Sequence, residues 1–538
     1  MNFLLLLSLL ISSTYVAPAT FQEQIKIYNQ TIEIKTFPSS LTAPSEVQNF
    51  IQKHASKRRP FKLASYDPKA LKTLSSSFLN NDDIEISNVR TSPKFIFALR
   101  QSLETNPSAL NIPSLRGVDG KSAVDIGVIT PTPQTVLNNV KTNQFKSKSK
   151  FKSKFKSKSK SKHSIGDYMY WTGDLRGVKQ LTDDDISFWI NFVVFDDLGT
   201  EEEVDDDVHV PMLWLSSPAI SAQTHYDKSH NLFIQLHGTK RIMLFPPAQG
   251  RNLYSYPSIH SAKKQSQVSF NDAWDGGGGV FSNFTNVQGY EVELKEGEVL
   301  YIPPFWWHQI TTSPESHALS LSVVSPSWEE AVLAKAFWTP VPFKNFTSSV
   351  ERKVAAQMLL VHVISRVPSL GSPQLFANFV FEARWQSLYE DFEFGGEGEG
   401  QGEGQGQGQG QGCFAEEELE EVEKIRGAIF DSDGDELFVE AAEGIANILN
   451  DELLLNGIRM VFMADYVESL AQFAVGMGGM GGKDEHDNEI GAGVVGFIAN
   501  CLNYDAIDIV QEFDEDTILV ENGDRDRENE SENGYRDL

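Results

Sequence analysis

Two histidines and one aspartate have the types and spacing that best suit metal chemistry in this sequence. His225 and Asp227 are separated by one residue, in the segment Gln223-Thr-His-Tyr-Asp227. In a β-strand, residues i and i+2 project to the same face, so an imidazole and a carboxylate at this spacing can share one ion. The same two residues can also form a hydrogen-bonded pair on a half-buried strand, and a third ligand is needed to favour a metal site.

His308 is the candidate for that third ligand. It lies 81 residues after Asp227, at the end of Gly297-Glu-Val-Leu-Tyr-Ile-Pro-Pro-Phe-Trp-Trp-His308. The apolar run and the Pro-Pro pair before it indicate a strand end, so we expect His308 just beyond a strand, at the rim of a barrel. Two histidines and one carboxylate leave three adjacent positions of an octahedral ion open, as in non-haem Fe(II) oxygenases. A structural zinc site is normally closed by a fourth protein ligand.

Short strands are the elements that must position these side chains. Between residues 165 and 330, apolar runs are separated by turn residues and by the pairs Pro246-Pro247 and Pro303-Pro304. Short strands with turn signals every 8 to 12 residues or so are typical of an all-β sandwich or barrel. The predicted strands cover residues 210–215, 231–236, 241–245, 290–294, 299–302 and 318–324.

The rest of the chain divides by composition. Helical periodicity predicts helices within 328–391, 416–430 and 437–474. From Lys146 to Lys162 every second residue is lysine, and such a run of like charges predicts a solvated, disordered linker or, alternatively, a polyanion-binding arm. The predicted organisation is a signal peptide (1–19), an N-terminal extension packing on the core (20–140), a Lys/Ser-rich linker (141–164), a β core (165–330), a helical segment (331–394), a flexible Gly/Gln/Glu linker (395–412) and an acidic helical tail (413–538).

The net charge of −28 belongs almost entirely to the C-terminal segment. Residues 413–538 carry a net charge of −26, which leaves −2 for residues 1–412. A nearly neutral core argues against a nucleic-acid partner that is held by phosphate neutralisation. The two cysteines, Cys413 and Cys501, exclude a disulfide scaffold and a Cys-rich zinc module, although they can form one bridge.

The N-terminus predicts entry into the secretory pathway. Phe3–Ile11 is an apolar run followed by Ala17-Pro18-Ala19, the pattern of a cleaved signal peptide. The run is too short to span a bilayer, and no later apolar stretch of about 20 residues predicts a transmembrane helix. We therefore expect location in the endoplasmic reticulum lumen or secretion.

Several blocks in the 165–330 region carry a family resemblance. They are His225-Tyr-Asp227, Asn231-Leu-Phe-Ile-Gln-Leu-His-Gly-Thr-Lys240-Arg-Ile-Met-Leu-Phe-Pro-Pro247, Tyr256-Pro, Gln265-Ser-Gln-Val268, Gly289-Tyr-Glu and Gly297 to His308. In order and spacing they resemble the JmjC, cupin-like 2-oxoglutarate oxygenases, and most of all the asparaginyl hydroxylase type that inhibits hypoxia-inducible factor. The resemblance implies a mainly β fold, a double-stranded β-helix (cupin or jelly-roll) core with an N-terminal mixed extension and C-terminal helices.

The resemblance also implies cofactors and roles. It implies that His225, Asp227 and His308 hold Fe(II), with 2-oxoglutarate and O₂ as cosubstrates and a protein or peptide side chain as the hydroxylated substrate. Lys240, thirteen residues after Asp227, matches the family lysine that binds the far carboxylate of 2-oxoglutarate. Tyr170 matches a family tyrosine that donates a hydrogen bond to the same carboxylate. The C-terminal helices resemble in placement a family dimerisation segment, which implies a possible homodimer.

Other matched positions concern the cosubstrate and substrate pockets. The family Ser or Thr three residues before the first metal ligand is replaced by Ala222, and Ser221 and Thr224 are the neighbours that could supply the hydroxyl. Asn231 matches a polar residue near the metal pocket, and Gln265 matches a glutamine that contacts the substrate amide.

Other interpretations of these residues remain open. Lys240-Arg241 can be an exposed strand pair, Trp306-Trp307 can be core residues, and Gln265 can be an ordinary loop residue. The whole domain can be a cupin-fold binding or scaffold protein without turnover, which the substitution at Ala222 favours. A lysine demethylase is a third possibility, against which the predicted secretory address argues.

Overall fold

The computed structural model describes residues 26–27, 34–35, 44–63, 74–75, 77–79, 89–92, 96–97, 127–129, 168–175, 211–260, 262–268, 281–341, 346, 348–386, 414, 418–430, 434–475 and 493–505. The predicted signal peptide, the lysine-rich segment, the 395–412 linker and Cys413 lie outside the described residues.

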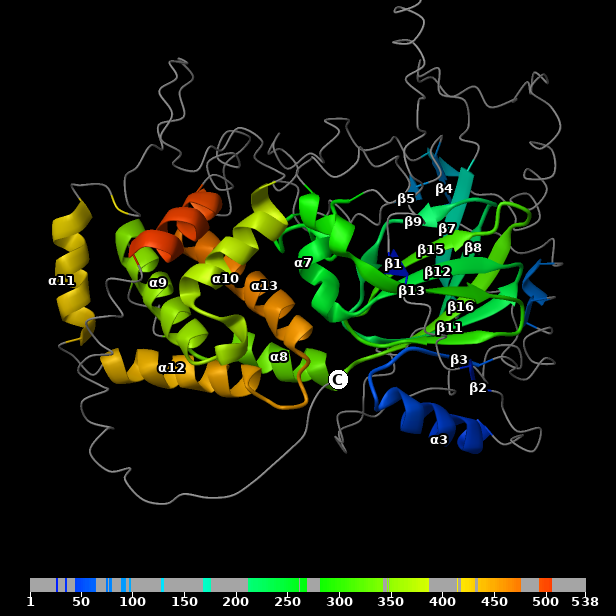
Figure 1. Cartoon of the computed structure of the whole chain (residues 1–538), viewed down its shortest axis with the longest axis horizontal. Coiled ribbons are helices and arrows are strands. Elements are labelled where there is room, and N and C mark those ends of the chain that lie inside the picture. Colours follow the sequence, from blue (N-terminus) through cyan, green and yellow to red (C-terminus); the bar gives the residue numbers. More distant parts are fainter. Residues whose placement is uncertain are drawn as a thin grey trace, which may run out of the picture.

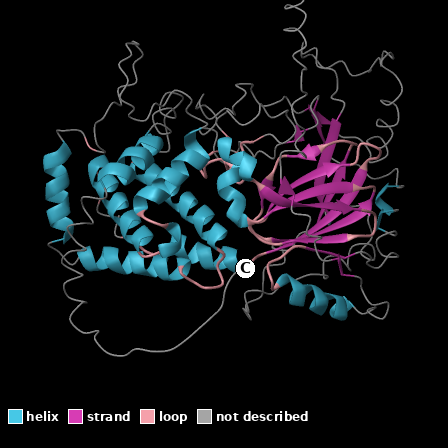
Figure 2. Ribbon diagram, viewed as in Figure 1, coloured by secondary structure: helices cyan, strands magenta, loops and turns pink. Residues whose placement is uncertain are grey.

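Two β-sheets form one half of the described structure and helices form the other (Figures 1 and 2). The larger sheet has the strand order β2-β3-β14-β11-β16-β8-β7-β4-β6, and the smaller has the order β1-β13-β12-β15-β9-β5, with β10 also paired to β15. The strands are β1 Lys26–Ile27, β2 Ile34–Lys35, β3 Phe61–Leu63, β4 Val89–Ser92, β5 Ile96–Phe97, β6 Gly127–Ile129, β7 Tyr168–Asp174, β8 Pro211–Ser216, β9 Ser221–Ala222, β10 His225–Tyr226, β11 His230–His237, β12 Lys240–Phe245, β13 Gln288–Leu294, β14 Val299–Ile302, β15 Trp307–Thr312 and β16 Ala318–Ser325.

Alternation along the strands determines which side chains lie between the two sheets. In β16, Leu319 and Leu321 belong to the apolar cluster that also includes Ile51 of the helix α3 (Pro44–Ala55). The alternate residues Ser320 and Ser322 face the other way, toward the smaller sheet. The space between the sheets therefore has polar as well as apolar walls.

An apolar cluster between the sheets joins them. It combines Phe233, Leu300 and Ile302 of the larger sheet with Ile242 and Leu244 of the smaller one. Two antiparallel sheets closed over a shared interior are the architecture of a jelly-roll, and the predicted cupin-like fold is confirmed.

The prolines end the strands where the sequence predicts. β12 stops at Phe245 before Pro246, and β14 stops at Ile302 before Pro303. His308 lies beyond β14 and the Pro303-Pro304 pair, as expected, but it belongs to a further strand that was not predicted, because β15 begins at Trp307 immediately after that turn. The left-handed conformation of Phe305 (φ 62°) turns the chain back within that short distance.

The helices gather beside the sheets, and α8, α9 and α10 begin with serine caps. Ser348 and Glu351 form a capping box at the start of α9, and Ser372 caps α10 ahead of Pro373. Among the described helices, none is both long and apolar enough to cross a membrane. The helices are α7 Gly250–Leu253, α8 Trp328–Trp338, α9 Ser349–Ser365, α10 Pro373–Val380, α11 Leu419–Phe430, α12 Gly434–Leu449 and α13 Asn456–Ala474, with 3₁₀-helices η5 Pro247–Gln249, η6 Ser282–Asn286 and η7 Pro368–Leu370 and π-helices η8 Phe381–Trp385 and η11 Phe497–Asp505.

The C-terminal helices share one core with the barrel, which the sequence does not predict. Ile445 of α12 and Val467 of α13 lie in the same buried cluster as Leu359 of α9 and as Tyr226 and Trp307 of the barrel. The apolar faces of α12 and α13 need a partner, and α9 supplies it. The helices of the predicted acidic tail thus pack against the strands that carry two of the metal-ligand candidates.

Candidate metal and cosubstrate site

Strand pairing brings the two histidines together. β10 pairs antiparallel with β15, and His225 is directly opposite His308 in that register. Their ring centroids are 4.2 Å apart. His308 also pairs with Leu244, whose side chain lies in the cluster between the sheets, so both imidazoles are at the barrel interior.

Asp227 completes the group at the edge of the barrel. Its Oδ2 atom is 3.7 Å from Nε2 of His308, and its side chain is 46% exposed. One potential ligand atom from each of the three residues lies within 4.8 Å of the others. The peptide N–H of Phe305 donates to the Asp227 carbonyl at 2.7 Å, so the turn before β15 holds the backbone of this carboxylate.

Backbone carbonyls orient both imidazoles. Nδ1 of His225 lies 2.7 Å from the Gln223 carbonyl, and Nδ1 of His308 lies 3.0 Å from the Trp306 carbonyl. Because a carbonyl only accepts, each Nδ1 must carry the proton, which leaves the lone pair of Nε2 for a metal. The tautomers follow from these contacts.

The protonation states also suit a cation. Burial, together with the neighbouring His225, lowers the pKa of His308 to about 4, so its imidazole is neutral at physiological pH. Burial alone would raise the pKa of Asp227, but the electrostatic interactions with His225, His308 and Lys264 outweigh burial and lower the pKa. A neutral imidazole and an ionised carboxylate are the forms that bind metal.

The group has three members among the described residues, with no fourth His, Cys or carboxylate in it. Three protein donors on one side of an ion leave positions for cosubstrate and oxygen, whereas a closed tetrahedral site would not. This donor set fits Fe(II).

Lys240 lies inside the barrel and is 2% exposed. Within the described part of the chain its ammonium group makes no ion pair. Nζ lies 5.0 Å from the centroid of the Phe233 ring, in the cluster between the sheets. Burial lowers the pKa of Lys240 to about 7. A buried cation of this kind calls for an anionic ligand, which fits the far carboxylate of 2-oxoglutarate.

Hydroxyl and amide groups surround the same interior. Tyr170 pairs in register with Ser216, and the Ser216 hydroxyl is 2.7 Å from that of Thr312, the cross-strand neighbour of Lys240. Ser322 donates to Oδ1 of Asn231 at 2.7 Å. Tyr170 and Asn231 therefore lie on the inner face where the resemblance implies them.

Two further polar groups face the interior without a partner. The Thr172 hydroxyl and the indole N–H of Trp214 are buried and make no hydrogen bond with the residues that the structure describes. Sequence reasoning missed Ser216, Thr312, Thr172 and Trp214, although counting in twos from Tyr170 and His308 would have found two of them, Thr172 and Thr312.

Ala222 does face inward, and the two candidate replacements for its hydroxyl differ. The Ser221 hydroxyl bonds that of Thr311 at 2.9 Å, which is on the opposite face of β15 from Thr312. Ser221 therefore points away from Lys240. Thr224 is fully buried beside His225, and its hydroxyl makes no hydrogen bond with a described residue.

Gln265 lies next to the metal group. It forms an isolated antiparallel bridge with His225 and is 4% exposed. Two backbone bonds continue this contact: Tyr226 N–H donates to the Lys264 carbonyl, and Ser266 N–H donates to the Thr224 carbonyl. The segment that carries Gln265 is thus paired with the ligand strand.

Comparison with known proteins agrees with this geometry. Residues 105–341 match the cupin-like domain family. Relatives named for a JmjC domain also match the chain. The chain is 33% identical over 107 residues to Jumonji C domain-containing protein 5 of Drosophila melanogaster, covering 20% of this chain and 26% of that protein.

Other relatives are named for different activities. Lysine-specific demethylase JMJ31 of Arabidopsis thaliana is 30% identical over 102 residues, 18% of each chain. The tRNA wybutosine-synthesizing protein 5 of Homo sapiens is 36% identical over 96 residues, 18% of this chain and 28% of that protein. The aligned segment spans less than a third of the length of these relatives. JmjC cupin domains are usually oxygenases, and the relatives differ in what they act on.

Proposed function

We propose that this protein is an Fe(II)- and 2-oxoglutarate-dependent dioxygenase that hydroxylates protein side chains. The observation that carries the proposal is the combination of the open His225, Asp227 and His308 group with the unpaired, buried Lys240 inside one barrel. A metal site alone suits many proteins, but a buried ammonium group behind it calls for an acidic cosubstrate. The cupin-like JmjC domain supports the same conclusion.

Each residue has a definite part in this proposal. When bound, Fe(II) and 2-oxoglutarate would supply the oxidising chemistry, in which O₂, the keto acid and a substrate C–H bond give the hydroxylated substrate, succinate and CO₂. His225 and His308 hold the metal through Nε2 while the Gln223 and Trp306 carbonyls fix their rings. Lys240 anchors the far carboxylate, and the apolar wall at Phe233 and Leu244 keeps bulk water from the reacting face.

Gln265 supports a peptide substrate of the asparaginyl hydroxylase type. It is the side chain beside His225 on the paired segment, where an incoming amide would approach the metal. The relative named for tRNA wybutosine synthesis makes a nucleic-acid substrate the competing outcome.

The test is succinate formation by the purified full-length chain with Fe(II), 2-oxoglutarate and O₂. Wild type should form succinate slowly even without substrate, and Asp227→Ala should abolish it. Glu315→Ala, which removes an exposed carboxylate on the β15–β16 turn, is the matched control and should retain full activity. Peptide arrays followed by mass spectrometry for a one-oxygen gain then identify the substrate.

A silent cupin-fold scaffold is the second candidate, and Ala222 favours it. With Ser221 turned outward, one family hydroxyl is missing from the cosubstrate pocket. A scaffold would bind metal and yet give no succinate above the Asp227→Ala background, so the same assay separates the two.

We also propose that the protein works in the secretory pathway. Cys501 is disulfide-bonded, and the sequence has one other cysteine, Cys413. Structural disulfides persist in oxidising compartments, which supports the address that the N-terminal apolar run predicts. Glycosidase treatment of the protein expressed in eukaryotic cells tests this, since the sequon Asn283-Phe-Thr285 would carry glycan only after translocation.

A further inference from the structure

Buried charged residues of the helical half hold in place the loop that pairs with β10, the strand that carries His225. We call residues 254–260 and 262–268 the pairing loop. Its Lys264 carbonyl accepts the N–H of Tyr226, the residue between His225 and Asp227. Any shift of the pairing loop is therefore transmitted directly to the backbone that carries two metal-ligand candidates.

The pairing loop needs external support. Tyr254 (φ 48°) and Lys264 (φ 67°) both adopt the left-handed conformation, which costs a non-glycine residue about 1–3 kcal/mol at sites of this kind. The loop has few regular ladder bonds of its own, apart from the bridges His225–Gln265 and Ser255–Ser266. Its conformation must be stabilised by contacts elsewhere.

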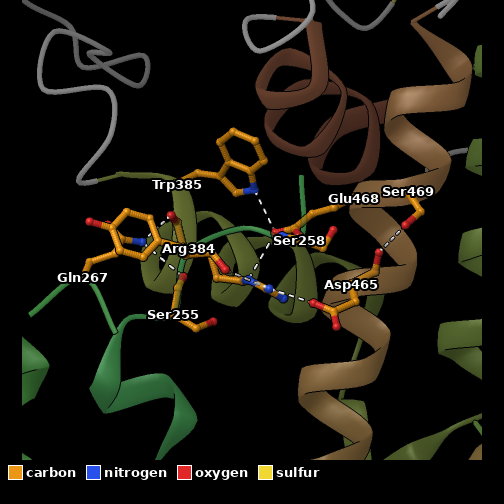
Figure 3. Close-up of polar contacts among 9 residues, drawn as sticks. Ser255, Ser258, Gln267, Arg384, Trp385, Asp465, Glu468 and Ser469 are labelled. Carbon is orange, nitrogen blue, oxygen red and sulfur yellow. Dashed lines mark hydrogen bonds and ion pairs between the residues drawn. The ribbon is translucent and has the colours of Figure 1, made fainter. Parts of the chain in front are cut away.

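Arg384 supplies one part of that support (Figure 3). This residue of η8 is 3% exposed, and its guanidinium group donates to the Tyr256 carbonyl at 3.1 Å and to Oδ1 of Asp465 at 2.7 Å. Its own carbonyl accepts from Nε2 of Gln267 at 2.7 Å. Arg384 thus contacts the loop near both of its ends.

Glu468 of α13 supplies the other part. It is fully buried, and Oε2 accepts the backbone N–H of Ser258 at 2.6 Å. Its Oε1 lies 3.2 Å from Nε of Arg384 and accepts the indole N–H of Trp385 at 3.0 Å. The carboxylate therefore joins the centre of the loop to the helices in the arrangement seen in Figure 3.

Stability alone does not account for this cluster. Replacing a buried ion pair by well-packed apolar residues is often neutral or stabilising, whereas hydrogen-bonded charges fix one geometry. Each of these hydrogen bonds to the loop involves a backbone group or the Gln267 amide. The cluster therefore fixes the position of the loop backbone, whatever most of the loop side chains are. The three charges lie at the contact between the helical half and the barrel edge that carries the metal group.

We infer that Arg384 and Glu468, with Asp465, are positioning residues that set the metal-ligand geometry of this domain through the pairing loop. The inference rests on the proposed metal site and extends it to the C-terminal helices. It makes the helical half part of the catalytic unit, because α13 holds the pairing loop at Ser258 and the loop in turn accepts the N–H of Tyr226 through the Lys264 carbonyl.

Cobalt binding to the full-length protein tests the inference. Co(II) is the probe, since its visible absorption reports ligand geometry as well as occupancy. Glu468→Gln and Arg384→Lys should each weaken Co(II) binding by about tenfold and alter the ligand-field spectrum, as loss of supporting hydrogen bonds does at other metal sites. Gln267→Met removes the side-chain bonds to the Arg384 and Ser255 carbonyls without touching a charge. It should give a smaller change in the same direction, which keeps the test valid if a charge variant fails to fold.

Gln357→Met is the matched control. Gln357 is fully buried in α9 and donates to the Cys501 carbonyl at 2.6 Å, so its loss also removes a buried polar bond from the helical half. It should lower the unfolding midpoint and leave cobalt affinity and spectrum unchanged. An unchanged spectrum in Glu468→Gln, Arg384→Lys and Gln267→Met, or the same change in Gln357→Met, would overturn the inference.

Failure of the proposed activity gives a different result. If wild type forms no succinate while the three loop-support variants still perturb bound cobalt and Gln357→Met does not, the positioning role stands and the oxygenase proposal falls. If wild type is active and the variants bind cobalt as wild type does, the positioning role falls alone.

Discussion

The buried lysine makes cosubstrate binding depend on pH in a way that can be calculated. Without an anion nearby, burial lowers the pKa of Lys240 to about 7, so the neutral amine predominates above that pH. The far carboxylate of 2-oxoglutarate binds the ammonium form and stabilises it. Above pH 7 the ligand must therefore bring a proton with it, and each pH unit weakens apparent binding by up to about tenfold.

The expected size follows from one titrating group. The dissociation constant should rise about twofold between its low-pH limit and pH 7 and about tenfold between pH 6 and pH 8. The carboxylates of the ligand are already ionised over this range, and metal-bound histidines do not titrate there. Lys240 is thus the group whose protonation changes.

Isothermal titration of the Mn(II)-loaded protein in buffers of different ionisation enthalpy measures both quantities. At pH 8, binding should take up close to one proton, and at pH 6 almost none. Lys240→Met should bind weakly with no proton uptake, whereas Lys240→Arg, which stays charged, should bind with a flat pH profile. A wild-type affinity that is constant from pH 6 to pH 9 would refute the reasoning.

Three further predictions concern stability. Because the pKa of Lys240 is lower in the folded protein than in the unfolded chain, the unfolding free energy of ligand-free wild type should rise between pH 7 and pH 10. Lys240→Met should flatten this rise, which urea denaturation at several pH values measures. Gly457→Ala should cost about 1–3 kcal/mol, since a Cβ there would overlap the backbone of Pro247 and Ala248 where α13 meets the barrel, whereas Gly444→Ala, with only Thr339 nearby, should be tolerated; thermal unfolding of both compares them. Cys501→Ser should lower stability by about 2–4 kcal/mol, and a reductant should then have no further effect; an equal effect of reductant on variant and wild type would contradict the disulfide assignment.

Most of the barrel strands could be predicted from the pattern of apolar residues along the sequence. The predicted strands 231–236, 290–294 and 299–302 fall within β11, β13 and β14, because alternating or fully apolar runs between prolines and glycines leave little freedom of interpretation. β15 was missed because its residues mix aromatic, polar and β-branched side chains directly after a Pro-Pro turn. Helical periodicity predicted helical structure over residues 437–474 without a break. The structure divides this range into α12 and α13, with residues 450–455 between them.

The metal group was predictable because each member belongs to a short recognisable pattern. The support around it was not, because it depends on contacts over long sequence separations. Arg384 contacts Tyr256, which lies 128 residues before it, and Asp465, which lies 81 residues after it. No pattern near Arg384 in the sequence points to either partner. Likewise, whether Ser221 or Ala222 faces the cosubstrate pocket depends on the register between β9 and β15, which a single sequence does not specify.

The most direct test of the central claim is the anomalous difference map of a crystal grown with Mn(II) and 2-oxoglutarate. We expect one peak within bonding distance of Nε2 of His225, Nε2 of His308 and the Asp227 carboxylate, with the keto acid on the open side and its far carboxylate against Nζ of Lys240. A peak elsewhere, a fourth protein ligand on the metal, or a far carboxylate that leaves Lys240 untouched would contradict the account.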